Sequence, residues 1–194
     1  MAWERGRVDR EFALVVHPTG PAPTAAKSRR AWLSQYARAK KLEFFFHGIP
    51  SVAAILDVGC ADGWVRQWAQ QRGWTNITGV DLASPADIVG NICDWRRLGL
   101  KAHSFDVIIV FEVVEHGGLA EALRELLKPD GLLMATTPVP HLDWACKAME
   151  AMGLLQRRTG AHTHLVDLRK YPGFRVVDRR IKGFVSQWAI LAPR

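Results

Sequence analysis

The strongest structural signal in this 194-residue chain is the stretch Ala53–Gly63, with the sequence AAILDVGCADG. An apolar run over Val52–Leu56 has the length and composition of a buried parallel strand. The glycines that follow suit a tight turn in which the backbone can approach a ligand closely. The residues Trp64–Gln71 can then form a helix whose first N–H groups face that turn. Strand, glycine turn and helix in this order predict the first unit of a nucleotide-binding α/β sheet.

The spacing within the turn discriminates between two kinds of ligand. A dinucleotide-binding loop has the pattern GxGxxG, whereas this chain places Asp57, Gly59, Ala61 and Gly63 at alternate positions. A carboxylate just before the first glycine would repel the pyrophosphate of a dinucleotide, because both groups are negative. The same carboxylate suits a ligand that carries an ammonium group, so the pattern favours a cationic ligand.

This stretch resembles motif I of the class I S-adenosylmethionine (SAM) dependent methyltransferases, with Ala61 where a third glycine is common. Alanine is small, so we expect the turn to tolerate it. The resemblance implies that SAM is the cofactor. The cofactor-binding residues that it implies in this turn are Asp57, Gly59, Cys60, Ala61, Asp62 and Gly63.

The next two strands are expected to supply further contacts to SAM. An apolar strand over Asn76–Val80 ends at Asp81 and Leu82, where a carboxylate can accept hydrogen bonds from two vicinal ribose hydroxyls. A short third strand precedes Asn91 and Asp94. The resemblance implies an acceptor for the adenine amino group at this point. Asn91 is the nearest match, and Asp94 is the open alternative.

Two later segments extend the resemblance. The sequence SFDVIIV over Ser104–Val110 predicts a fourth strand, and FEVVEH over Phe111–His116 follows it. FEVVEH resembles motif IV of a methyltransferase branch that includes the ubiquinone-pathway O-methyltransferases, and LRELLKPDGLLMATTP over 123–138 is similar to the same branch. The resemblance implies that Phe111 and Glu112 line the methionine or adenine side of the cofactor.

Together these segments predict an α/β fold, a doubly wound Rossmann-like sheet of seven mostly parallel strands with helices on both faces. The strand order 3-2-1-4-5-7-6 is what the resemblance implies. Residues 1–23 are expected to form an N-terminal arm, and residues 24–194 a single methyltransferase domain. Further helices are expected over 24–47, 118–127 and 141–152, and further strands over 87–90, 131–136, 174–180 and 185–192.

The composition is that of an ordinary soluble globular chain, with 48% hydrophobic and 23% charged residues. A length of 194 residues is enough for one domain with a full core. No apolar run approaches the ~20 residues of a membrane span, and the charged first ten residues lack the apolar core of a secretory signal. The three scattered cysteines, Cys60, Cys93 and Cys146, indicate a reducing environment and have no metal-ligand spacing. We therefore expect a cytoplasmic protein without membrane contact.

The net charge of +7 is unevenly distributed, with +5 over residues 1–50, −5 over 51–155 and +7 over 156–194. Basic flanks around an acidic cofactor region would attract an anionic partner, RNA included. The small size and the lack of an added RNA-binding domain favour a small hydroxylated acceptor. The sequence therefore predicts O-methylation of a small molecule, with RNA methylation as the alternative. A SAM-binding partner subunit without activity is a third interpretation.

The residues after the fourth strand are candidates for the chemistry. A hydroxyl acceptor needs a base or a Lewis acid, whereas the sulfonium leaving group needs no acid. On a first helical turn, Glu112, Glu115 and His116 would share one face. With His164 they would form a set able to hold Mg²⁺ or Mn²⁺, as in some methyltransferases with an ExxEH motif and a later histidine. The alternative needs no metal: His116 is the general base, and Glu115 is the second candidate catalytic residue.

Overall fold

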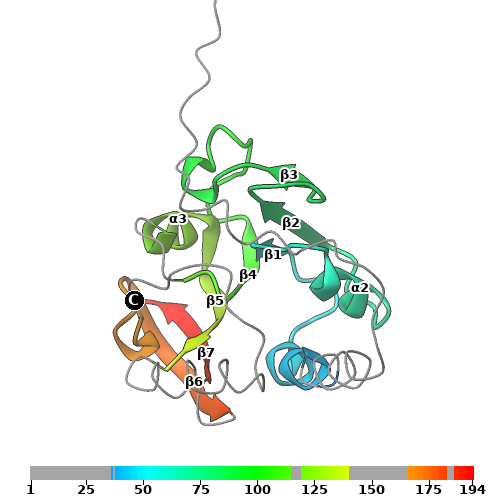
Figure 1. Cartoon of the computed structure of the whole chain (residues 1–194). Coiled ribbons are helices and arrows are strands. Elements are labelled where there is room, and N and C mark those ends of the chain that lie inside the picture. The colour runs from blue at the N-terminus through cyan, green and yellow to red at the C-terminus, as the bar shows by residue number, and fades with distance from the viewer. Residues whose placement is uncertain (1–35, 37, 115–118, 140–165, 183–185) are drawn as a thin grey trace, which may run out of the picture.

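The computed structural model describes residues 36, 38–114, 119–139, 166–182 and 186–194. Its seven strands form one sheet with the order β3-β2-β1-β4-β5-β7-β6 (Figure 1). The first five strands are parallel, and β7 runs antiparallel to both β5 and β6. The predicted fold class and strand order are therefore confirmed. The strands are β1 (Ile55–Val58), β2 (Ile77–Asp81), β3 (Ile88–Val89), β4 (Phe105–Phe111), β5 (Leu127–Pro138), β6 (Phe174–Lys182) and β7 (Ser186–Pro193).

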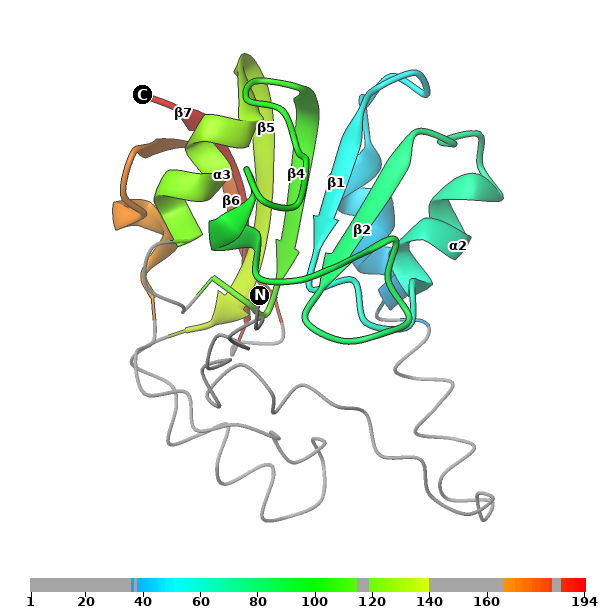
Figure 2. The same cartoon turned by 90° about the horizontal axis from the view of Figure 1, so that it is seen from above.

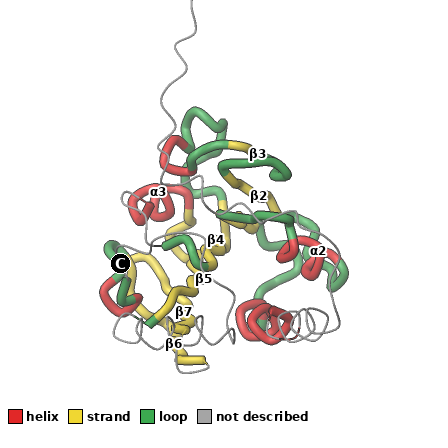
Figure 3. Tube along the Cα trace, in the orientation of Figure 1, coloured by secondary structure: helices red, strands yellow, loops and turns green. Residues whose placement is uncertain are grey.

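Helices cover both faces of the sheet (Figures 1 and 3). α2 (Trp64–Gln70) and a helix over 38–46 lie on one face, and α3 (Leu119–Leu126) lies on the other (Figure 2). Two short 3₁₀ helices, η1 (Ile92–Asp94) and η3 (Leu168–Lys170), follow β3 and precede β6. In the described ranges, no helix has both the length and the apolar character needed to cross a membrane.

Some predicted segments fall outside the described residues. These are the N-terminal arm over 1–23, the part of the predicted 24–47 helix before residue 36, and the helix over 141–152. The helix over 38–46 agrees with the second half of the 24–47 prediction. The predicted positions of α2, α3 and the strands agree with the structure to within a few residues, except at the start of β5.

β5 begins earlier than predicted. The sequence KPDG over 128–131 predicts a turn, but in the structure the strand continues through it from Leu127. The pairing of β5 with β4 shifts register between Phe105 and Val107, which marks a bulge or irregularity in the ladder. Since Pro129 has no N–H to donate, such an irregularity is where a proline can be accommodated within a strand.

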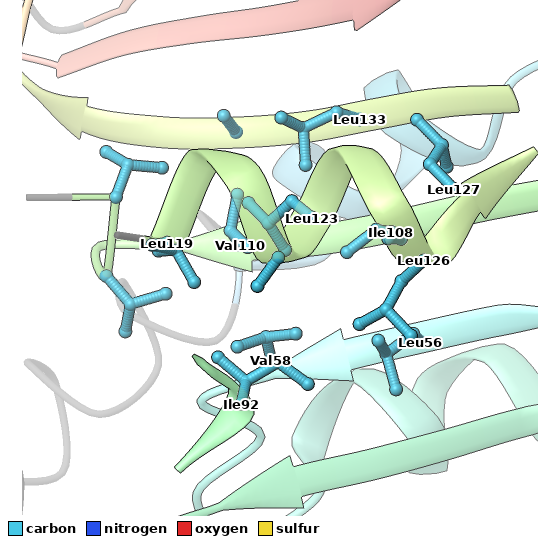
Figure 4. Packing of buried hydrophobic residues seen from close by; sticks show 14 of the residues in the cluster. Leu56, Val58, Ile92, Ile108, Val110, Leu119, Leu123, Leu126, Leu127 and Leu133 are labelled. Atoms are coloured by element: carbon cyan, nitrogen blue, oxygen red, sulfur yellow. The ribbon is translucent and has the colours of Figure 1, made fainter. Parts of the chain in front are cut away.

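The central strands alternate their side chains between two cores. In β4, Ile108 and Val110 belong to the cluster beneath α3, whereas Val107 and Ile109 belong to the cluster beneath α2 and the helix over 38–46. Figure 4 shows the leucines of α3 packed against Ile108 and Val110. Because successive residues of a strand point to opposite faces, a continuous apolar run is what a strand covered on both sides requires.

A buried glutamine of β7 joins two other segments. Gln187 Nε2 donates to the carbonyl oxygens of Pro138, at 3.2 Å, and Val166, at 2.6 Å. Its Oε1 accepts from the N–H of Leu168 at 3.3 Å and from Nε of Arg179 at 3.4 Å. Gln187 is 0% exposed, so its amide cannot bond to water, and these hydrogen bonds take the place of those that it makes to water in the unfolded chain. One amide thus fixes the chain on both sides of residues 140–165.

The sheet brings the carboxyl ends of β1, β2, β4 and β5 to the same edge (Figure 2). Asp57 of β1 is in register with Gly79 of β2 and Ile109 of β4, and Phe111 of β4 is in register with Thr136 of β5. The chain order reverses between β1 and β4, and in open α/β sheets ligands bind at such a switch point.

Candidate active site

The turn after β1 requires glycine at position 59. Gly59 has a φ of 76°, and a Cβ placed there would lie 2.8 Å from Cγ1 of Val113. Ala61 has a φ of 48° and is therefore also left-handed, a conformation that glycine adopts more readily than other residues. Gly63, with a φ of 72°, is the N-cap of α2, and its N–H donates to the carbonyl of Cys60 at 2.9 Å. Three residues of this turn, Gly59, Ala61 and Gly63, thus have the left-handed backbone that glycine adopts most readily.

Asp81 links the end of β2 to this turn. Its Oδ2 accepts a hydrogen bond from the N–H of Ala61 at 2.8 Å, and its Oδ1 lies 3.4 Å from the N–H of Ala83. The residues after Asp81 are bends and form no helix, so the carboxylate is not a helix cap. Leu82, the other predicted contact here, is half-buried. The two segments predicted to bind the nucleoside are thus held together by one side chain.

Asp57 is a buried carboxyl group beneath the turn. Its side chain belongs to a residue that is 3% exposed, and its Oδ2 has no hydrogen-bond partner. Burial raises the pKa of Asp57 to about 7, while the nearby Arg66 guanidinium lowers it and the Asp81 carboxylate raises it further. A buried carboxyl oxygen without a partner is costly, so a donor or cation supplied by a ligand would stabilise it.

Arg66 of α2 is a member of the site that the sequence analysis did not identify. It forms an ion pair with Asp87, whose Oδ2 also accepts from the N–H of Gly79 at 2.7 Å. A Cβ on Gly79 would lie 2.8 Å from Sγ of Cys60 and 3.0 Å from the Arg66 guanidinium. Burial raises the pKa of the Cys60 thiol to about 11, with two neighbouring carboxylates adding to the rise. Cys60 is therefore a protonated thiol that packs below the turn.

Asn91 and Asp94 both lie after β3. Asn91 Oδ1 accepts from the N–H of Cys93 at 3.0 Å and thereby caps η1. Asp94 is the last residue of η1 and is exposed, as is Asp62 in the glycine turn. Asn91 thus has a local structural role as the cap of η1. The choice between Asn91 and Asp94 as the adenine contact stays a prediction.

Glu112 directly follows β4 and has a φ of 62°. Its N–H donates to the Thr136 carbonyl at 2.8 Å, and its Oε1 accepts from Thr136 Oγ1, also at 2.8 Å. Nζ of Lys41 lies 3.4 Å from both Glu112 Oε1 and Thr136 Oγ1. The ring of Phe111, predicted to line the cofactor, lies 6.1 Å from that of Trp64. A left-handed residue other than glycine is uncommon and is often found at functional sites.

The predicted catalytic and metal residues are only partly described. Glu115, His116 and His164 lie outside the described residues. The prediction that a first helical turn includes Glu112 is wrong, because this residue is left-handed. Among the residues that the structure does describe, no group of three or more His, Cys, Asp or Glu side chains could hold a metal ion. The metal site and the general base stay predictions.

A family model described as a methyltransferase domain matches residues 29–171, which include the glycine turn, Asp81 and Glu112. The chain belongs to this methyltransferase family. The predicted resemblance to class I SAM-dependent methyltransferases is thereby confirmed at the level of the family.

The methyltransferase domain also has curated relatives. It is 30% identical over 105 residues to a ubiquinone biosynthesis O-methyltransferase of Actinobacillus pleuropneumoniae serotype 7 (strain AP76), a match that covers 43% of this chain and 44% of that protein. It is 30% identical over 158 residues to a protein of the same name from Roseobacter denitrificans (strain ATCC 33942 / OCh 114), covering 68% of this chain and 62% of that one. The chain thus spans less than half the length of the first relative.

Solved structures share the fold of this domain. The magnesium protoporphyrin IX methyltransferase of Synechocystis PCC 6803, solved with bound S-adenosylhomocysteine (SAH), aligns with a TM-score of 0.59 and 16% identity over 91% of this chain and 90% of that one. A protein of Pyrococcus horikoshii OT3 aligns with a TM-score of 0.61 and 16% identity over 82% and 91% of the two chains. At such identities the likeness shows the fold alone.

Proposed function

We propose that this domain is a SAM-dependent methyltransferase that methylates a hydroxyl oxygen of a small molecule. The observation that carries the proposal is the buried Asp57 carboxyl with an unpartnered oxygen, directly below a glycine turn at the switch point of the sheet. The names of the curated relatives support oxygen as the acceptor atom and a small molecule as the substrate.

The residues present fit the cofactor. The turn keeps its shape only with glycine at position 59, because Val113 fills the space that a side chain there would need. Asp81 has lone pairs beyond those used by Ala61, and we propose that they accept from the ribose hydroxyls. Asp57, beneath the turn, would favour the positive charge of the ligand. When bound, SAM would supply an activated methyl group on a sulfonium, whose departure needs no proton.

The acceptor hydroxyl needs a base, and we propose His116 for that role, with Glu115 as the second candidate. An imidazole with a pKa of about 6.5 can take up a proton near neutral pH. This assignment rests on the position of His116 directly after β4 in the sequence. A rate that does not change with pH between about 5.5 and 8, in both the parent and His116→Gln, would contradict it.

Glu112 does not fit the role of a metal ligand. Its carboxylate already accepts from Thr136 at 2.8 Å and lies 3.4 Å from the Lys41 ammonium. A cationic neighbour at that distance would compete with Mg²⁺ or Mn²⁺ for the same oxygen. We therefore derive no step through a metal held by Glu112, Glu115, His116 and His164.

Calorimetric titration of SAH into the purified protein tests the cofactor site. We expect binding in the parent and at least tenfold weaker binding in Asp81→Ala, because a ribose hydrogen bond to a carboxylate is lost. Asp130→Ala is the matched control, since Asp130 is exposed near the start of β5, away from the carboxyl edge of the sheet. A parent that binds no SAH would refute the proposed function.

Turnover is then measured as SAH formed from SAM with pools of hydroxylated small molecules. Formation of SAH with such a pool is the expected result. SAH binding without turnover on any pool would indicate that this chain is a SAM-binding partner subunit without activity of its own. Turnover on RNA, together with an affinity for RNA that falls steeply as the salt concentration rises, would show that the methyl acceptor is RNA and not a small molecule.

A further inference from the structure

Lys41 reaches the edge of the sheet at which the methyl acceptor must bind. It lies on the helix over 38–46, and its side chain is only 17% exposed. Its Nζ lies 3.4 Å from Glu112 Oε1, just after β4, and 3.4 Å from Thr136 Oγ1, near the end of β5. An ammonium group is therefore held at the carboxyl ends of two central strands, beside residues that we place at the cofactor.

Aromatic rings surround this ammonium group. Nζ of Lys41 lies 5.1 Å from the ring centroid of Phe111 and 6.0 Å from that of Trp188. The Phe111 ring in turn lies 6.1 Å from that of Trp64. A second cation, Lys182, lies 5.7 Å from the Trp188 ring. Among the described residues, two ammonium groups and one carboxylate, that of Glu112, thus lie beside these rings.

The ion pair with Glu112 does not account for the position of Lys41. Both contacts of its Nζ are at the long end of hydrogen-bond distances, whereas Glu112 has a shorter hydrogen bond from Thr136 at 2.8 Å. An ammonium has three donors, so two long contacts leave capacity for a third acceptor. Withdrawing a lysine side chain from water also costs free energy, which a strong anionic partner would offset.

We propose that Lys41 binds the acceptor oxygen and holds it as an oxyanion. The ligand that suits this site is a planar compound with an acidic hydroxyl group, bound as a phenolate. The O–H bond of the phenol breaks, its electron pair stays on the oxygen, and its proton passes to the base proposed above and from there to the solvent. Lys41 keeps its own protons and donates one hydrogen bond to the oxyanion. This inference rests on the proposed methyl transfer to oxygen and adds a residue that contacts the acceptor.

The test uses 4-nitrophenol, whose phenolate has an absorption band that the neutral phenol lacks. The 194-residue protein saturated with SAH is titrated with the probe in an acidic buffer in which the free probe is mostly neutral. We expect the bound probe to have the phenolate band. Lys41→Met should lose this band and bind the probe about 10- to 100-fold more weakly, because a hydrogen bond between two charged groups is lost. Lys41→Arg should retain part of the band.

The matched control is Lys40→Met. Lys40 is the preceding residue of the same helix, its side chain is 52% exposed, and it pairs with Glu43 at 2.7 Å. This variant should bind the phenolate like the parent. A phenolate band that persists in Lys41→Met, or a parent that binds the probe only as the neutral phenol or not at all, would overturn the inference.

SAH affinity is measured on the same samples by calorimetry, and it should be unchanged in Lys41→Met. A parent protein that binds SAH but does not bind the phenolate would refute the inference about Lys41 and leave the proposed function standing. Failure of the parent to bind SAH would end the proposed function itself, so the two failures are distinguishable.

Discussion

Replacing Asp57 with asparagine separates the effect of a buried charge from the effect of side-chain shape. The carboxyl and the amide have nearly the same size, so the packing below the glycine turn is preserved. Asp57 is 3% exposed, and burial raises its pKa from an ordinary 3.8 to about 7. In the unfolded chain the carboxyl loses its proton near pH 4, whereas in the folded protein it keeps the proton up to about pH 7.

The sign of the effect follows from this difference in proton binding. Between these two pKa values the folded state binds one proton more than the unfolded state, so the free energy of unfolding falls as the pH rises. From pH 5 to pH 8 the loss attributable to Asp57 is about 3 kcal/mol. Asp57→Asn has no such proton to lose, and over this range its stability should gain about 3 kcal/mol relative to the parent. For a domain of this size, that corresponds to roughly 6–12 °C in melting temperature.

The assay is urea unfolding of both proteins at several pH values between 5 and 8. Only the difference between the two is interpreted, because histidines titrate in the same range. Asp106→Asn is the control without pH dependence: hydrogen bonds from Lys128 and from the Ala54 N–H lower the pKa of Asp106, so this carboxyl is ionised in both the folded and the unfolded chain throughout this range. Parallel pH profiles of the parent and Asp57→Asn would refute the reasoning. The same variant should bind SAH more weakly, because the negative charge below the turn is gone.

Three further changes test other parts of the site and fold. Gly59→Ala should lose about 1–3 kcal/mol in urea unfolding, from its left-handed φ and its clash with Val113, and Val113→Ala should restore part of that loss in the double variant. Gln187→Leu leaves three buried backbone groups without partners and should cost at least about 3 kcal/mol, so stability like that of the parent would contradict the role of the amide. Arg66→Met removes a positive charge that lowers the pKa of Asp57, so the fall in stability that ends near pH 7 in the parent should extend to higher pH.

The strands of the central sheet were predictable because each is covered on both faces. Val107, Ile108, Ile109 and Val110 form an uninterrupted apolar run, and such a run bounded by polar residues indicates a buried strand without knowledge of its neighbours. The start of β5 was not predictable in the same way. Lys-Pro-Asp-Gly has strong turn chemistry, and in the structure it is the irregular stretch between Leu127 and Leu132, which pair with Phe105 and Val107 of β4.

The site was predictable where it follows directly from a strand end. Asp81 ends β2 in the sequence, so its place at the ligand edge required only the rule for parallel sheets. Lys41 is 71 residues from Glu112 in the sequence, and their contact depends on how one helix lies across the sheet. Arg66 depends likewise on the rotation of α2 about its axis. No local pattern carries that information, because a charged residue on a helix usually faces solvent.

Gln187 has a consequence for how the chain between β5 and η3 can vary. Its amide ties Pro138 and Val166, which flank residues 140–165, to the same strand of the sheet. Between two fixed anchor points, the entropy cost of loop closure varies only slowly with the length of the intervening sequence. We therefore expect that the sequence of residues 140–165 can be exchanged while the sheet and its glycine turn stay unchanged. A chimera that carries this segment from a relative should keep its SAH affinity, and a chimera that loses it would show that the two parts are not separable.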